Sequence, residues 1–320
     1  MSSGYPAGDA ARDRWILARR APRTILNPRR AYAAHVEPEL SEDGDTVDVA
    51  TIFLTNRECP WRCLMCDLWK NTLEESVPRG AIAGQIRAAL AGLPPARRVK
   101  LYNAGSFFDP HAIPPEDHAE IAEAVRTFDR VIVEAHPSLV GDSCLGFRDR
   151  IAGRLEVAMG LETVHPDVLS RLNKRMTTER FAEAAAFLHG AGIALRVFVL
   201  AGLPFVDAEE GIGATRASIA WAFEHGASAV AVIPTRSGNG ALDDLAARGE
   251  FAEPSLAALE DAVAFGLGLG RGRVFADLWD LERFRRCDAC FASRAARLAS
   301  MNRSQRVSPR TPCASCEGRS

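Results

Sequence analysis

The sequence lacks long apolar runs: none approaches the roughly 20 residues that a membrane-spanning helix needs, and its start has no apolar signal-peptide segment. Its 39 lysine and arginine residues nearly balance its 41 aspartate and glutamate residues, so the formal net charge is only −2. A net charge this close to zero gives no overall positive field to attract nucleic acid. A local basic patch would not show in the net charge. These absences predict a cytoplasmic protein with no membrane partner.

The chain contains eight cysteines and no secretion signal. Of the eight cysteines, Cys144 stands alone, and the others fall into two closely spaced groups. Such spacing outside an oxidising compartment indicates metal or cluster binding rather than disulfides. We interpret Cys144 as an ordinary packed thiol.

The order of apolar segments predicts the fold class. Short apolar runs alternate with amphipathic helical stretches, which is typical of βα units around a parallel sheet. The predicted strands are residues 51–54, 99–102, 130–134, 155–159, 195–200 and 229–233. Six units favour an α/β fold of the partial (β/α)6 barrel type, with a doubly wound sheet as the alternative.

Domain boundaries follow from the same pattern. Residues up to about Pro38 are rich in arginine and show no strand pattern, so we expect a partly helical extension whose arginines form a solvated face. We predict an N-terminal extension over residues 1–46, the barrel core over 47–280 and a small metal-binding segment over 281–320.

Three cysteines, Cys59, Cys63 and Cys66, lie in a loop that directly follows the first predicted strand. Thiolates suit iron–sulfur clusters and zinc. Three ligands would leave one iron of a 4Fe–4S cluster open to a second molecule, whereas a structural zinc site needs a fourth protein ligand. Zinc binding completed by a distant histidine, or buried structural thiols, are the alternatives.

The CxxxCxxC spacing after a first strand resembles the radical S-adenosylmethionine (SAM) superfamily. The segments at residues 160–167 and 173–177 are similar to those of the branch that contains the archaeosine synthase radical SAM subunit and, more distantly, the elongator catalytic subunit. The resemblance covers roughly residues 48–290 and implies an enzyme with a TIM-barrel-like core.

The resemblance also implies roles for single residues. Cys59, Cys63 and Cys66 would hold the 4Fe–4S cluster, and SAM would chelate the open iron. The implied cofactor-binding residues lie at strand ends, where α/β barrels gather their chemistry: Gly105, Ser106, Glu134, Glu162, Arg196, Gly202 and Pro204. His136 and His165 precede prolines, and we interpret them as structural.

A second cysteine group consists of two CxxC pairs near the end of the chain. Four thiolates from two such pairs can close a tetrahedral metal site. Zinc is the simpler occupant and a second 4Fe–4S cluster is the alternative. The predicted ligands are Cys287, Cys290, Cys313 and Cys316.

The predicted function is reductive cleavage of SAM to a 5′-deoxyadenosyl radical, which abstracts hydrogen from a substrate. The resemblance implies an electron donor such as flavodoxin or ferredoxin. A modified nucleoside or tRNA base and a small metabolite both remain open as the substrate. A different class of function is a non-enzymatic zinc-binding adaptor in which both cysteine groups are structural.

Overall fold

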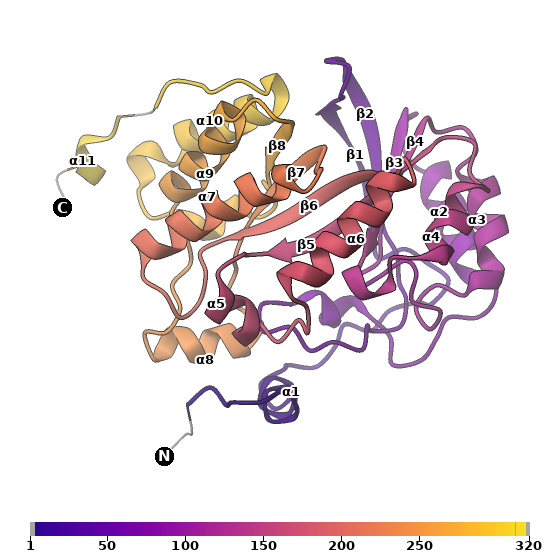
Figure 1. The fold of residues 1–320 in the computed structure, drawn as a ribbon, viewed down its shortest axis with the longest axis horizontal. Helices are drawn as coiled ribbons and strands as arrows, with labels where there is room; N and C mark the ends of the chain where they lie inside the picture. Colours follow the sequence, from indigo (N-terminus) through magenta and orange to yellow (C-terminus); the bar gives the residue numbers. More distant parts are fainter. Residues whose placement is uncertain (1–3, 311, 318–320) are drawn as a thin grey trace.

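One sheet of eight strands organises the residues that the computed structural model describes, namely 4–310 and 312–317 (Figure 1). The strands follow one another in sequence order; β1 is antiparallel to β2, and every later pair of neighbours is parallel. Because β1 and β8 form the two edges, the sheet is an open half-barrel. The strands are β1 (Ala33–Leu40), β2 (Thr46–Phe53), β3 (Arg98–Tyr102), β4 (Arg130–Ala135), β5 (Arg154–Glu162), β6 (Ala194–Ala201), β7 (Ala229–Pro234) and β8 (Arg273–Ala276).

Helices connect successive parallel strands and cover the outer face of the sheet (Figure 1). Several begin at a side-chain cap: Thr177 accepts a hydrogen bond from the backbone N–H of Arg180, and Asp207 accepts one from Glu210. The helices are α1 (Asp9–Leu17), α2 (Ala81–Ala91), α3 (His118–Ala124), α4 (Asp142–Arg148), α5 (Pro166–Arg171), α6 (Thr178–Gly190), α7 (Ala208–Glu224), α8 (Ala241–Ala247), α9 (Leu256–Gly268), α10 (Asp288–Ser304) and α11 (Ala314–Glu317), with 3₁₀ turns η1 (Leu68–Asn71), η2 (Pro115–Asp117), η3 (Pro137–Leu139) and η4 (Leu281–Phe284). None of the helices described has the length and apolar character needed to cross a bilayer.

The two faces of the sheet differ sharply in polarity. Outward-facing residues such as Ile52, Leu101 and Val133 are fully buried in the main core beneath the helices. Inward-facing residues are more polar because side chains alternate along each strand. Lys100 and Arg196 both form ion pairs with Glu39 inside the half-barrel, at 2.7 and 2.6 Å.

The α/β partial barrel predicted from the sequence is confirmed. The six predicted strands correspond to β2–β7. The expectation of no strand before about Pro38 is wrong, because β1 begins at Ala33 and pairs with β2 over eight positions. Strand β8, of four residues, was also not predicted.

Candidate functional site

The cysteine loop lies at the carboxyl edge of the parallel sheet, between β2 and η1. Cys59, Cys63 and Cys66 are free and half-buried there. Burial raises the pKa of all three thiols, that of Cys66 to about 12. Metal binding would therefore replace protons on sheltered thiols rather than capture thiolates already exposed to water.

Segments remote in sequence fasten the cysteine loop. The backbone N–H of Leu64 donates to the carbonyl of Leu172 at 2.9 Å, and Asn173 Nδ2 donates to the carbonyl of Arg62 at 2.8 Å. On the other side, Asn239 Nδ2 donates to the carbonyl of Leu64 at 2.8 Å. The loops after β5 and β7 thus fix the backbone on both sides of Cys63.

The N-terminal segment packs against the same loop (Figure 1). Trp15 and Ile16 of α1 share a buried cluster with Leu64 and with residues of α8. Arg20 pairs with Glu58, directly before Cys59, at 2.7 Å, and Arg23 also binds Glu58. These arginines therefore hold the cysteine loop rather than forming the solvated face expected from the sequence.

An aromatic stack supports the loop from the β4 side. The ring of Trp61 lies on the imidazole of His136 with centroids 3.7 Å apart and planes 12° apart. Burial lowers the pKa of His136 to about 3, so its imidazole is neutral. Its Nε2 faces the carbonyl of Lys174 at 3.1 Å and its Nδ1 faces Ser138. This environment agrees with the structural role predicted for His136.

Unsatisfied polar groups lie next to the cysteine loop, in the turn after β3. A Cβ added to Gly105 would sit 3.0 Å from Cβ of Cys59, so the two segments are in close contact. The Ser106 hydroxyl and both amide atoms of Asn103 are buried without a hydrogen-bond partner. Such groups are costly unless a ligand satisfies them.

Glu134, at the end of β4, faces the same turn. Its Oε2 accepts a hydrogen bond from the backbone N–H of Asn103 at 2.8 Å. Burial raises its pKa to about 7, although hydrogen bonds from the Asn103 and Ala104 backbone oppose the shift. A buried carboxyl that titrates near neutral pH suits a ligand carrying a positive charge.

Glu162 ends β5 in the left-handed region, with φ 66°, and forms a buried ion pair with Lys174. A Cβ on Gly160 would sit 2.2 Å from Glu162 Oε1 and 2.3 Å from Lys174 Nζ, so the glycine makes room for the pair. Lys174 was not among the predicted site residues. The sequence signal was available, because Lys174 belongs to the family-like stretch at residues 173–177.

The other predicted cofactor residues divide into two groups. Gly202, at φ 81°, and the buried Pro204 lie in the turn after β6, and the space above Gly202 is filled by Pro254, 2.5 Å from a Cβ placed there. Arg196 lies in the ion network near the opposite end of the strand, where Glu39 and Glu156 accept its hydrogen bonds at 2.6 and 2.7 Å. This position does not support the predicted contact between Arg196 and a cofactor.

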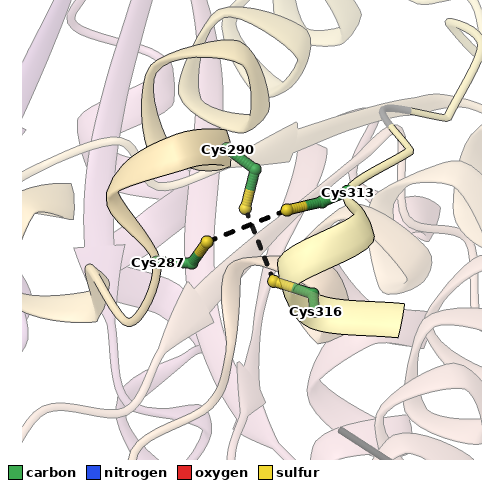
Figure 2. A group of neighbouring side chains, drawn as sticks. All are labelled: Cys287, Cys290, Cys313 and Cys316. Carbon is green, nitrogen blue, oxygen red and sulfur yellow. Dashed lines mark hydrogen bonds between the residues drawn. The ribbon is translucent and has the colours of Figure 1, made fainter. Parts of the chain in front are cut away.

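The four C-terminal cysteines converge from two segments, the start of α10 and α11 (Figure 2). Cys287 Sγ lies 3.8 Å from Cys313 Sγ, and Cys290 Sγ lies 3.7 Å from Cys316 Sγ. All four sulfur atoms lie within 4.8 Å of one another. Among the described residues this is the one group of three or more such ligands found close enough to share one ion.

A positive side chain supports the C-terminal cysteine group. Arg294 Nε donates to Cys290 Sγ at 3.3 Å, and its guanidinium also binds the buried Glu260 of α9. Hydrogen bonds, first from the Cys290 backbone, lower the pKa of Cys287 to about 7. A charged donor beside a thiolate favours the metal-binding form of the sulfur.

Comparison with known proteins finds relatives that are similar to this chain in sequence. No protein-family model matches the chain. The archaeosine synthase subunit β of Thermococcus kodakarensis is 28% identical over 166 residues, which cover 49% of this chain and 51% of the relative. The predicted resemblance to this branch of radical SAM enzymes is confirmed. An uncharacterized protein of Methanocaldococcus jannaschii is 22% identical over 227 residues, or 66% of this chain and 62% of that protein.

Two solved structures share parts of the backbone. Elp3 of Methanocaldococcus infernus matches with a TM-score of 0.48 and 14% identity, over 59% of this chain and 51% of that one. Coproporphyrinogen III oxidase of Escherichia coli, described as a radical SAM enzyme, matches with a TM-score of 0.46 and 11% identity, over 67% and 50%. Because these scores are modest, the fold assignment rests on the strand order itself.

The match to the archaeosine synthase subunit β agrees with the branch to which the sequence was predicted to be similar. The chain spans about half to three fifths of the length of the curated relatives that it matches.

Proposed function

We propose that this chain is a radical SAM enzyme whose 4Fe–4S cluster is held by Cys59, Cys63 and Cys66. The observation that supports this most directly is the setting of the three thiols: they are free and half-buried at the carboxyl edge of the sheet, beside the unpartnered buried groups of Asn103 and Ser106. In a cubic cluster each cysteine binds its own iron, so the ligands stand further apart than around a single ion. Three ligands leave one iron free.

The turn after β3 and the end of β4 fit SAM as the second molecule. SAM brings an amino group, a carboxylate and a sulfonium, which can satisfy the buried Ser106 hydroxyl and the Asn103 amide beside Cys59. Glu134 and Glu162 would face its positive groups, and Gly105 allows close approach of the backbone. Gly202 and Pro204 would pack on the adenine, as the family resemblance implies.

When bound, the cluster would pass one electron to SAM, and cleavage of the sulfonium would give methionine and a 5′-deoxyadenosyl radical that abstracts hydrogen from the substrate. The protein contributes placement and exclusion of water. Trp61 and His136 hold the loop, and the N-terminal segment covers it. A flavodoxin or ferredoxin would supply the electron, and the free thiols suit the reducing cytoplasm.

Two classes of substrate fit this chemistry. One is a modified nucleoside or tRNA base, which the name of the relative archaeosine synthase suggests, and the other is a small metabolite. The N-terminal arginines nearest the site are engaged with Glu58, so they offer tRNA little free charge. This favours a small molecule or free nucleoside. Salt-dependent retention of tRNA would support the other choice, because phosphate contacts release counterions.

We propose zinc for the C-terminal cysteines. A tetrahedron with Zn–S bonds of about 2.3 Å has sulfur–sulfur edges of about 3.8 Å. The two sulfur–sulfur distances of 3.8 and 3.7 Å match this edge. A second 4Fe–4S cluster would need four separate irons at this site, and the close spacing disfavours it.

Anaerobic reconstitution with iron and sulfide tests the proposal. The wild-type protein should turn brown and, with dithionite, form 5′-deoxyadenosine from SAM. Cys63→Ala should abolish this product, whereas Cys144→Ala, which alters the buried lone thiol, should retain it. A colourless protein would favour the zinc-binding adaptor, and unchanged cleavage in a variant lacking all three rim cysteines would refute the mechanism.

A further inference from the structure

Lys174 is a buried cation whose backbone is held against the cysteine loop. Its neighbours in sequence are fixed to the residues on both sides of Cys63: Leu172 accepts from Leu64 at 2.9 Å, and Asn173 donates to Arg62 at 2.8 Å. The backbone carbonyl of Lys174 meets His136 Nε2 at 3.1 Å. The lysine is thus held in place from the cysteine loop and from β4.

Among the described residues, the ammonium of Lys174 pairs with Glu162. The two side chains form an ion pair, and both are less than a tenth exposed. A buried charge interacts strongly with its surroundings because little water screens it. The pair lies at the carboxyl end of β5, where a Cβ placed on Gly160 would sit 2.3 Å from Lys174 Nζ, so the ammonium lies at the edge of the sheet that carries the cysteine loop.

We propose that Lys174 is a positioning residue for cluster charge: its ammonium, fixed by Glu162 at the carboxyl end of β5, raises the reduction potential of the cluster held by the neighbouring cysteine loop. This inference rests on the proposed function. A cluster held by three thiolates becomes more negative when it takes up an electron, and a fixed cation nearby stabilises that reduced form. Glu162 acts in the opposite direction, since its carboxylate offsets part of the ammonium charge.

The pair predicts shifts of opposite sign. In Lys174→Met the cluster loses the cation and keeps the carboxylate, so it should be harder to reduce. In Glu162→Gln the cation remains without its anionic partner, so the cluster should be easier to reduce. Lys174→Arg keeps the charge and should stay near the wild type. A purely structural role would not produce opposite shifts.

Lys100 offers a matched control. It is also a buried lysine in a carboxylate pair, with Nζ 2.7 Å from Glu39 Oε2, but it lies in the ion network inside the half-barrel. Lys100→Met should destabilise the fold through loss of a buried pair, yet it should leave the reduction potential unchanged.

The test is a redox titration of the reconstituted proteins, followed by electron paramagnetic resonance of the reduced cluster. At the wild-type midpoint, Lys174→Met should have a reduced-to-oxidised ratio on the order of tenfold lower, and Glu162→Gln should have a higher ratio. If Lys174→Met takes up no iron, the comparison of midpoint potentials between Glu162→Gln and Lys174→Arg decides instead. A higher midpoint potential in Glu162→Gln than in Lys174→Arg would support the inference.

Equal midpoints in the wild type and Lys174→Met, shifts of the same sign in the two variants, or a shift in Lys100→Met as large as that in Lys174→Met would overturn the inference. Failure of the wild type itself to form a cluster would instead refute the proposed function. The two failures are therefore distinguishable.

Discussion

The two cysteine groups use the same side chain in different settings. The C-terminal group draws four sulfur atoms within 4.8 Å of one another, close enough for one ion. The rim group spreads three cysteines along a loop that two distant loops and the N-terminal segment hold open. The comparison teaches that spacing and support, more than ligand type, separate a closed structural site from one that can accept a further molecule.

The groups also differ in the surroundings of their thiols. Burial raises the pKa of all three rim thiols, that of Cys66 to about 12. In the C-terminal group, hydrogen bonds from the Cys290 backbone and from the other thiols lower the pKa of Cys287 to about 7, and hydrogen bonds among the thiols raise that of Cys316 to about 12. In the C-terminal group one thiol, Cys287, is therefore ready to ionise near neutral pH. The rim group must lose protons inside the folded protein.

Replacing all three rim cysteines with alanine should have the largest effect. Iron and sulfide should fall to near zero after anaerobic reconstitution, while zinc should stay at about one per chain. Elemental analysis of the variant and the wild type measures both. Substantial residual iron would mean that the C-terminal group holds a cluster, and the contrast between the two groups would be lost.

Cys290→Ser should weaken zinc binding by more than about a hundredfold, because it removes a ligand. Loss of a group that only hydrogen-bonds to a metal ligand already lowers metal affinity by roughly 10–100-fold. Competition with a chromophoric chelator measures this, and faster proteolysis after α10 should report release of the chain's end. The matched variant Ser315→Ala alters an exposed residue between two ligands and should retain zinc. Cluster formation at the rim should be unaffected in both variants.

Glu134 should make stability depend on pH at the rim. Burial raises its pKa from 4.5 to about 7, so the folded state binds the proton more tightly than the unfolded state. Its contribution is present below pH 4.5 and is lost as the pH rises through about 7. The free energy of unfolding falls by up to about 3 kcal/mol over this range, because one pKa unit corresponds to roughly 1.4 kcal/mol.

Urea unfolding of the metal-free wild type and Glu134→Gln at several pH values isolates this effect. His118 and His136, whose pKa values burial lowers, change stability in the opposite direction, but they are present in both proteins and cancel in the difference. A difference between the two proteins that is constant with pH would contradict the assignment.

Arg294→Met should have the smallest effect, a loss of about tenfold in zinc affinity, because the variant removes the donor to Cys290 and the partner of Glu260. Arg285→Met provides the control, since Arg285 binds Asp288 and Glu282 on the surface nearby. Equal zinc affinities in the two variants would show that the contact at Cys290 does not tune the site.

The sequence predicted the middle of the sheet well and its edges poorly. Strands β2–β7 carry apolar outer faces that stand out as short runs. Strand β1 contains Pro38, Glu37 and Glu39, which look unlike a strand, and the structure explains each. Pro38 is tolerated on an edge strand, and the glutamates face Lys100 inside the half-barrel.

Predicted residues that directly follow strand ends lie near the cysteine loop, and their contact with a cofactor stays a prediction. Glu134 lies beside the turn after β3 that contacts Cys59, and Glu162 acts on Cys63, as expected for residues at one edge of a parallel sheet. Arg196 is the third residue of β6, too early in the strand to reach that edge. Lys174 was missed because it follows α5 rather than a strand, and only tertiary packing brings its neighbours Leu172 and Asn173 to the cysteine loop.

The fastening of the rim loop has a consequence for maturation. Leu172, Asn173 and Asn239 all contact the loop, yet the last of these is synthesised more than 170 residues after Cys66. During synthesis the three thiols therefore emerge long before the chain that arranges them. Iron should be loaded late, onto a barrel whose seventh strand has already joined the sheet.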